Sequence, residues 1–146
     1  MKTIKNKHIG AYGVIIKDNK IALIKKALGG YTGKFDLPGG GMEHNELPHE
    51  TLKREIMEEA GFEVTKYDLI DVIATNIKWK MDEDIEEDLH HIGILYKVNV
   101  KGNIKHEPDG IDSNGCDWHE ISKLKKNELT PFTIYALEKL GYKLSS

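Results

Sequence analysis

The alternation of apolar and polar residues predicts a β-hairpin near the start of the chain. Residues 8–17 are apolar and β-branched, and residues 20–25 form a second apolar run. Asp18 and Asn19 between them make a favourable two-residue turn, because both residue types tolerate the backbone that such a turn requires. Further strands are predicted from the apolar runs at residues 69–80, 91–100 and 115–119.

Two segments show helical spacing instead. Residues 48–60 begin with Pro48, which suits the first helical position, and are followed by Gly61, which suits a left-handed C-terminal cap. A second helix is predicted near residues 131–140. The order strands, helix, strands, helix indicates an α/β (α+β) fold in which helices pack on a mixed β-sheet. The length favours a single domain spanning residues 1–146.

Composition excludes several classes of protein. The hydrophobic fraction of 39% is that of an ordinary globular chain. No apolar run approaches the roughly 18 residues of a membrane span, and the first residues lack the apolar region of a signal peptide. Cys116 is the single cysteine, so it cannot form an internal disulfide, and we expect a cytoplasmic protein in which it is small and buried. A thiolate zinc site is excluded because no CxxC pair is present.

The net charge of −3 conceals one acidic segment. Residues 82–88 contain six acids, and the rest of the chain carries a small excess of basic residues. A mildly basic body suits small molecules that carry phosphate, but it argues against duplex nucleic acid, which needs a clustered basic face. Because charge runs are usually exposed, we expect residues 82–88 to form a solvated loop rather than a lid or a source of metal ligands.

The helix at 48–60 carries an arrangement of carboxylates that folding alone does not explain. Glu55, Glu58 and Glu59 lie on one face, where they repel one another, and the helix dipole disfavours acids in the last turn. Arg54 can pair with only part of this charge. A divalent cation would explain the arrangement, since Mg²⁺ takes carboxylate, phosphate and water oxygens. The alternative is a solvated acidic face, and the glycine-rich residues 38–41 favour the cation, because they let backbone approach a ligand closely.

The same stretch resembles the signature of a known family. Gly40, Glu46 and the run from Arg54 to Phe62 match G-x5-E-x7-R-E-U-x-E-E-x-G-U, where U is apolar, at all nine specified positions over residues 40–62. This is the Nudix box, and the chain resembles MutT-like Nudix hydrolases. The resemblance implies a mixed sheet between helices and hydrolysis of the diphosphate bond in a nucleoside diphosphate linked to another group, with Mg²⁺ or Mn²⁺. The expected substrate is a nucleoside triphosphate.

The resemblance also implies roles for individual residues. Glu55 and Glu59 are the expected direct metal ligands, Gly40 would offer its carbonyl, and Glu58 would be a further ligand or the base that activates water. Arg54 would orient a glutamate, and Glu46 would brace the loop against the helix. Leu47 departs from the family, which often has a capping Thr or Ser there; losing such a cap costs about 1 kcal/mol of helix stability.

Other candidates rest on weaker signals. Asp112 resembles an acid that joins the metal cluster in MutT-like members, although it could equally be a turn residue. His90 and His91 would point to opposite faces of a strand, so they cannot share a metal. The residues expected to contact the substrate are Phe35, Gly39, Asn127 and Phe132, with Tyr31 and Glu128 as further candidates; the aromatic ones could instead be packing residues.

The resemblance leaves other functions open. A nucleotide-sugar or ADP-ribose pyrophosphatase is the alternative enzyme, and a nucleotide sensor without turnover is the alternative outside catalysis. Because all the box acids are present, hydrolysis is favoured over sensing. The partner is expected to be a small nucleotide, with no membrane. Dimers occur among similar proteins, so a homodimer is a further expectation.

Overall fold

The computed structural model describes residues 1–108 and 113–146, in which two four-stranded sheets carry two α-helices. The first sheet has the strand order β5 (Gly39–Gly41), β1 (Lys2–Val14), β7 (Ile85–Lys101), β6 (Glu63–Lys80). The second has β2 (Ile16–Lys17), β3 (Lys20–Lys26) and β4 (Phe35–Asp36), with β8 (Ser113–Glu120) also paired to β3. The pair β1–β7 is parallel and all the other pairs are antiparallel, so the predicted mixed sheet is confirmed.

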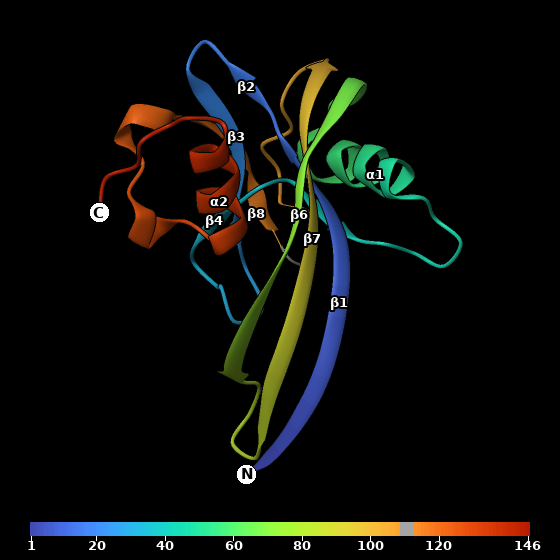
Figure 1. The fold of residues 1–146 in the computed structure, drawn as a ribbon, viewed down its shortest axis with the longest axis vertical. Coiled ribbons are helices and arrows are strands. Elements are labelled where there is room, and N and C mark those ends of the chain that lie inside the picture. The colour runs from blue at the N-terminus through green and yellow to red at the C-terminus, as the bar shows by residue number, and fades with distance from the viewer. Residues whose placement is uncertain (109–112) are drawn as a thin grey trace.

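The helices α1 (Pro48–Ala60) and α2 (Pro131–Lys139) lie on opposite sides of the first sheet (Figure 1). Two short 3₁₀ helices, η1 (Ile121–Lys123) and η2 (Lys126–Glu128), precede α2. Gly13 and Gly93 mark the two packing faces, because a Cβ atom would meet the Ile56 side chain at Gly13 and the Phe132 ring at Gly93. The apolar core therefore forms one cluster under α1 and another under α2.

Local sequence signals are mostly confirmed. Asp18 and Asn19 both adopt positive φ, of 52° and 61°, as the two-residue turn requires. The first helix has the predicted bounds, and Gly61 caps it in the left-handed conformation. Leu47 provides no side-chain cap, although its backbone N–H donates to Oε1 of Glu50 at 2.8 Å.

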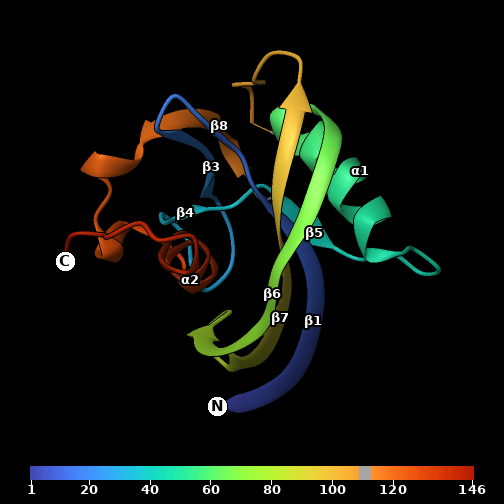
Figure 2. The ribbon, with the colours of Figure 1, turned by 45° about the horizontal axis from the view of Figure 1, so that its top comes forward.

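The prediction of a solvated loop at residues 82–88 is wrong for its second half. Only Asp82–Asp84 lie in the turn, while residues 85–88 begin β7 between β1 and β6. The reason is tertiary, because lysines of the neighbouring strands lie opposite these acids, with Lys5 and Lys78 both in register with Asp88. β1, β7 and β6 extend together past the rest of the molecule and curve toward the side on which α2 lies (Figure 2).

Two expectations about the whole chain can be compared with the described residues. Within them, no helix combines the length and the apolar character needed to cross a membrane. Cys116 is completely buried, and burial raises the pKa of its thiol to about 12, which agrees with the small structural residue expected.

Candidate active site

The glycine turn is held against β1 and leaves no room for side chains. Gly39, Gly40 and Gly41 form β5, in register with Tyr12, Ala11 and Gly10. A Cβ atom on Gly40 would lie only 2.6 Å from the carboxyl carbon of Glu55, and Gly39 has φ of 150°. Because the turn consists of glycine, α1 can bring its carboxylates against the backbone of β5.

Arg54 connects the loop to the helix. Its Nε donates to Oε2 of Glu46 at 2.6 Å and its Nη2 to Oε1 of Glu46 at 2.9 Å, a two-pronged contact. Nη2 also donates to the Gly41 carbonyl at 3.1 Å. Hydrogen bonds from Arg54, from the Glu43 backbone and from Thr51 lower the pKa of Glu46 to about 2. Arg54 therefore links Glu46 and the Gly41 carbonyl of the loop to the first helix.

The same guanidinium also reaches two box glutamates. Arg54 Nη1 lies 2.9 Å from Glu55 and 3.5 Å from Glu58. Burial raises the pKa of Glu55, and the Arg54 hydrogen bond opposes that rise. The Glu58 side chain is 56% exposed. Arg54 thus contacts three carboxylates of the box, and it also lies 3.7 Å from Glu43 outside the box. Of the three box carboxylates, that of Glu58 is the most exposed to water.

Glu59 is the most buried acid of the box. It is 5% exposed, and its Oε1 accepts a hydrogen bond from the Gly39 N–H at 2.8 Å. Burial, which opposes ionisation, raises its pKa to about 9 despite that hydrogen bond, and the charges of Glu55 and Asp36 act in the same direction. Ionisation of Glu59 at neutral pH is therefore unfavourable, and a divalent cation beside the carboxylate would favour it.

The chemistry of these donors fits a hard divalent cation. Glu55, Glu59 and the backbone of the glycine turn offer oxygen atoms, which Mg²⁺ prefers, and the buried Glu59 needs added positive charge to ionise. Across residues 1–108 and 113–146, no three His, Cys, Asp or Glu side chains already converge as metal ligands. Mg²⁺ commonly takes few protein ligands and completes its shell with water and substrate phosphate, so the donor set is compatible with joint binding of metal and nucleotide.

The remaining predicted residues are dispersed. Asp112 lies outside the described residues. Gly39 lies beside the box carboxylates, and its N–H donates a hydrogen bond to Glu59. The backbone carbonyl of Asn127 accepts a hydrogen bond from Nζ of Lys34 at 3.2 Å. Phe132 is 3% exposed and packs in the core against Tyr12 and His91. This position agrees with a packing residue, which was the alternative to a substrate contact.

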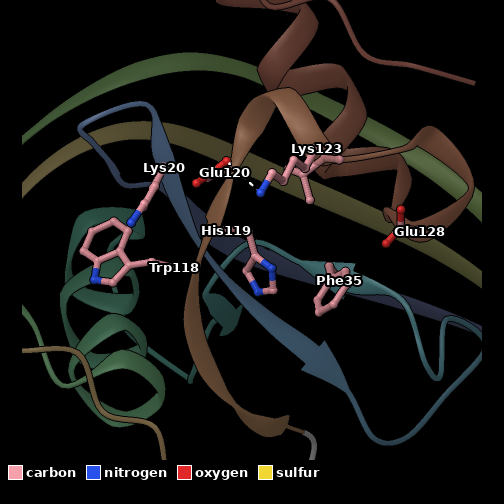
Figure 3. A pocket seen from close by; sticks show the side chains of 8 residues that line it. Lys20, Phe35, Trp118, His119, Glu120, Lys123 and Glu128 are labelled. Carbon is pink, nitrogen blue, oxygen red and sulfur yellow. Dashed lines mark ion pairs between the residues drawn. The ribbon is translucent and has the colours of Figure 1, made fainter.

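Phe35 and Glu128 come together in a separate surface depression. This depression, of about 440 Å³, lies over β4, β8 and the two 3₁₀ helices (Figure 3). The ring of His119 lies 4.5 Å from that of Phe35, and Lys123 pairs with Glu120 at 3.3 Å. None of the box residues lines the depression, so it is distinct from the carboxylate site.

Sequence reasoning missed two polar clusters that depend on strand register. Buried Asp36 accepts a hydrogen bond from Thr130 at 2.7 Å, which fastens the start of α2 to β4. His91 is hydrogen-bonded to the Tyr12 hydroxyl at 2.7 Å. Because His90 and His91 alternate along a strand, the sequence could have indicated that one of them faces inward. It could not have indicated that Tyr12 would be the hydrogen-bond partner of His91, because the two residues lie far apart in the chain.

The chain is similar to known proteins over most of its length. The family model described as NUDIX domain matches residues 7–140. A curated relative from Proteus vulgaris, named 8-oxo-dGTP diphosphatase, is 38% identical over 71 residues, which cover 48% of this chain and 63% of the relative. A second curated relative, from Methanocaldococcus jannaschii, is named ADP-ribose pyrophosphatase. It is 34% identical over 113 residues, which cover 77% of this chain and 63% of the relative. The chain therefore spans less than two thirds of each of these curated relatives.

Solved structures agree on the fold. A crystal structure of a MutT NUDIX hydrolase from Burkholderia pseudomallei has a TM-score of 0.75 and 26% identity, covering 92% of this chain and 98% of that one. A NUDIX hydrolase from Nitrosomonas europaea has a TM-score of 0.70 and 19% identity, covering 92% and 88%. The strand and helix arrangement described above is thus the arrangement found in those proteins.

Proposed function

The chain belongs to the Nudix family, and from that premise we propose that it is a metal-dependent hydrolase that cleaves a phosphoanhydride bond in a nucleoside diphosphate linked to another group. The single observation that carries the proposal is the burial of Glu59 against the Gly39 N–H beside a second carboxylate, Glu55. Such a pair is stabilised in its ionised form by a bound cation. The reaction class is inferred from the family, and the geometry of Glu55 and Glu59 supports a site that binds a divalent cation.

We assign the roles by burial and contact. Glu55 and Glu59 would hold Mg²⁺ or Mn²⁺ together with the Gly40 carbonyl. When bound, the metal lowers the repulsion between the diphosphate and an attacking oxygen and lowers the pKa of bound water. Arg54 positions Glu55 and the loop. Glu58, the most exposed of the three box acids that Arg54 contacts, is our candidate for accepting the proton of the attacking water.

The expected substrate class is a nucleoside triphosphate, cleaved to a monophosphate and pyrophosphate. The Proteus vulgaris relative, whose name specifies a diphosphatase of an oxidised nucleotide, supports it. The alternative, an ADP-ribose or nucleotide-sugar pyrophosphatase, is supported by the longer match to the Methanocaldococcus jannaschii relative. Both substrate classes place a diphosphate at the carboxylates and differ in the group that leaves.

The test is product release by the wild-type protein and by Glu59→Gln, with Mg²⁺. The substrate panel comprises nucleoside triphosphates, dinucleoside polyphosphates, ADP-ribose and nucleotide sugars. We expect turnover of at least one substrate by the wild type and loss of turnover in the variant. Tight nucleotide binding without any release would instead support a sensor and contradict the proposal.

A further inference from the structure

The segment that follows β7 packs against the C-terminal end of α1, in the turn that carries Glu58 and Glu59. Residues 102–107 leave β7 and pass over this end of the helix (Figure 2). The backbone N–H of Lys105 donates to the Ala60 carbonyl at 2.7 Å, and Nζ of Lys105 donates to the Glu58 carbonyl at 3.1 Å. Lys105 thus contacts the helix end through both its backbone and its side chain, although it lies 47 positions from Glu58 in sequence.

These contacts satisfy carbonyl groups that the helix itself leaves unpaired. The last four carbonyls of an α-helix have no partner within the helix, and in α1 they belong to residues 57–60. The N–H of Gly61 donates to the Met57 carbonyl at 3.0 Å, and Lys105 donates to the carbonyls of Glu58 and Ala60. Because the ends of helices fray, Lys105 stabilises the turn in which Glu58 and Glu59 lie.

The ammonium group of Lys105 also offsets an unfavourable charge at the helix end. Glu58 and Glu59 lie in the last turn of α1, where the helix dipole disfavours negative charge, and this turn contains no basic residue of its own. Lys105 brings a positive charge to the same end from a distant part of the chain. Because the effect of the dipole is confined to the last turn, a cation bonded to the Glu58 carbonyl acts where the acids lie.

Contacts on two sides hold Lys105 in this position. A Cβ atom on Gly61 would lie 2.9 Å from the Cβ atom of Lys105, so the cap glycine leaves the room that Lys105 occupies. On the other side, Nδ1 of His106 lies 2.5 Å from Oδ1 of Asp117 in β8. Gly115 of β8 is also close, because a Cβ atom there would overlap the carbonyl oxygen of His106. The residues around Lys105 are therefore packed between α1 and β8.

We propose that Lys105 is a positioning residue of the metal site, which fixes the last turn of α1 so that the carboxylates of Glu58 and Glu59 stay in place. The hydrogen bond of 2.8 Å between Glu59 and the Gly39 N–H requires this turn to remain formed. Metal ligands need to be held to within about 0.5 Å, so fraying of the turn would weaken metal binding. The inference rests on the proposed function, since it assumes that Glu59 binds the cation.

Binding of Mn²⁺ alone tests the inference without depending on turnover. Electron paramagnetic resonance of free Mn²⁺ compares the wild-type protein with Lys105→Met, which keeps an apolar stem but loses the charge and the Nζ donor. Loss of a residue that orients a metal ligand costs about 10–100-fold in affinity or activity, so we expect Mn²⁺ binding to weaken by at least about tenfold. Lys105→Arg keeps a charge and N–H donors, and it should bind Mn²⁺ within about threefold of wild type.

Hydrogen exchange locates the change within the helix. Without the Nζ contact the last turn of α1 should open more often, so the amides of residues 57–60 should exchange at least about threefold faster in Lys105→Met. Amides in the middle of α1 should keep the wild-type rate. Lys105→Gln, which also loses the charge, is measured in parallel and should show the same losses; it decides the outcome if Lys105→Met does not fold.

Lys101→Met is the matched control. It removes the same charge from an exposed lysine of β7, which pairs with the Glu63 side chain at 3.0 Å rather than with the helix end. We expect it to leave both Mn²⁺ affinity and the exchange of α1 within about twofold of wild type. Unchanged Mn²⁺ affinity in the neutral Lys105 variants, equal losses in Lys101→Met, no recovery in Lys105→Arg, or no Mn²⁺ binding by the wild type would overturn the inference.

A turnover assay separates this result from failure of the proposed function. If a nucleotide is hydrolysed while Lys105→Met keeps the wild-type kcat and Mn²⁺ affinity, the inference fails and the proposed function stands. If Mn²⁺ affinity depends on Lys105 but no diphosphate substrate is cleaved, the positioning role stands and the hydrolase proposal fails. For a hydrolysed nucleotide at saturating metal, we expect Lys105→Met to lower kcat by about tenfold with KM within about twofold, because Lys105 acts on the carboxylates and not on the nucleotide.

Discussion

The backbone N–H of Gly39 donates to Oε1 of Glu59 at 2.8 Å, which joins the glycine turn to the last turn of α1. This hydrogen bond joins two residues that lie twenty positions apart in sequence. It holds a carboxylate where water is excluded and where a second acid, Glu55, raises the cost of ionisation. The proposed metal chemistry depends on this relationship.

Glu59→Gln should separate activity from stability. At neutral pH without metal, the folded protein holds Glu59 protonated, because its pKa is about 9. Glutamine is a close neutral substitute, so we expect a change in unfolding free energy below ~1 kcal/mol, in the range of a single neutral hydrogen bond. Turnover should fall by a factor of at least ~10², since the metal loses a charged ligand. Urea unfolding and steady-state kinetics measure the two quantities; a large stability loss with retained turnover would contradict this.

The stability of the metal-free protein should fall as the pH rises. Below pH 4.5 both the folded and unfolded chains hold a proton on Glu59, so its contribution is complete. Above that, the unfolded chain ionises while the folded chain keeps the proton until about pH 9, so stability decreases through this interval. Mg²⁺ binds the ionised form, so it should raise Tm more at pH 9 than at pH 6.

Thermal unfolding with and without Mg²⁺ at several pH values measures this linkage. Glu59→Gln is the control, and its Tm should respond less to both pH and Mg²⁺. A magnesium effect of the same size in wild type and variant at every pH would exclude Glu59 as the linked group.

Gly40→Ala should disturb the site through one contact. The new Cβ would lie 2.6 Å from the Glu55 carboxyl carbon, so the carboxylate must move. We expect a stability loss of about 1–3 kcal/mol, as for overpacking, and a fall in kcat of at least ~10-fold. In an Glu55→Ala background the same substitution should cost much less stability, because the clashing group is gone. Equal costs in the two backgrounds would show that the strain lies elsewhere.

Arg54→Lys should weaken the connection between loop and helix. Lysine keeps the charge but cannot make the two-pronged contact with Glu46 and also reach the Gly41 carbonyl. We expect a loss of about 1–2 kcal/mol in unfolding free energy and a lower kcat. Lys53→Arg, an adjacent exposed position of α1, is the control with the opposite exchange. Unchanged kcat in Arg54→Lys would contradict the positioning role.

His91 should make the fold sensitive to mild acid. Burial, together with the nearby charges of His8 and Lys26, lowers its pKa from 6.5 to about 4. The neutral ring's contribution is complete above pH 6.5 and is lost as the pH falls toward 4, because the unfolded chain takes up the proton first. Urea unfolding between pH 7 and 4.5 should show a flatter pH dependence for His91→Gln than for wild type. His90→Gln, on the opposite face, should retain the wild-type slope.

The pattern of residues determined the local elements and the chemistry of the box by itself. Pro48 and Gly61 set the bounds of α1, and Asp18-Asn19 set the first hairpin, because capping and turn geometry depend on a few consecutive residues. The spacing of Arg54, Glu55, Glu58 and Glu59 on one helix likewise follows from helical periodicity. These are short-range properties, so they can be predicted without knowing the rest of the fold.

Tertiary structure alone decided which of these groups are buried and what they face. Glu59 and Glu58 are neighbours in sequence, yet one is buried at the Gly39 N–H and the other is exposed, because β5 covers only one side of α1. Residues 85–88 became a strand because β1 and β6 flank them. Glu87 is hydrogen-bonded to Asn6 and to Trp79, which lie 81 and 8 residues away in sequence. Desolvation and strand register arise from contacts between distant segments, and no local pattern encodes them.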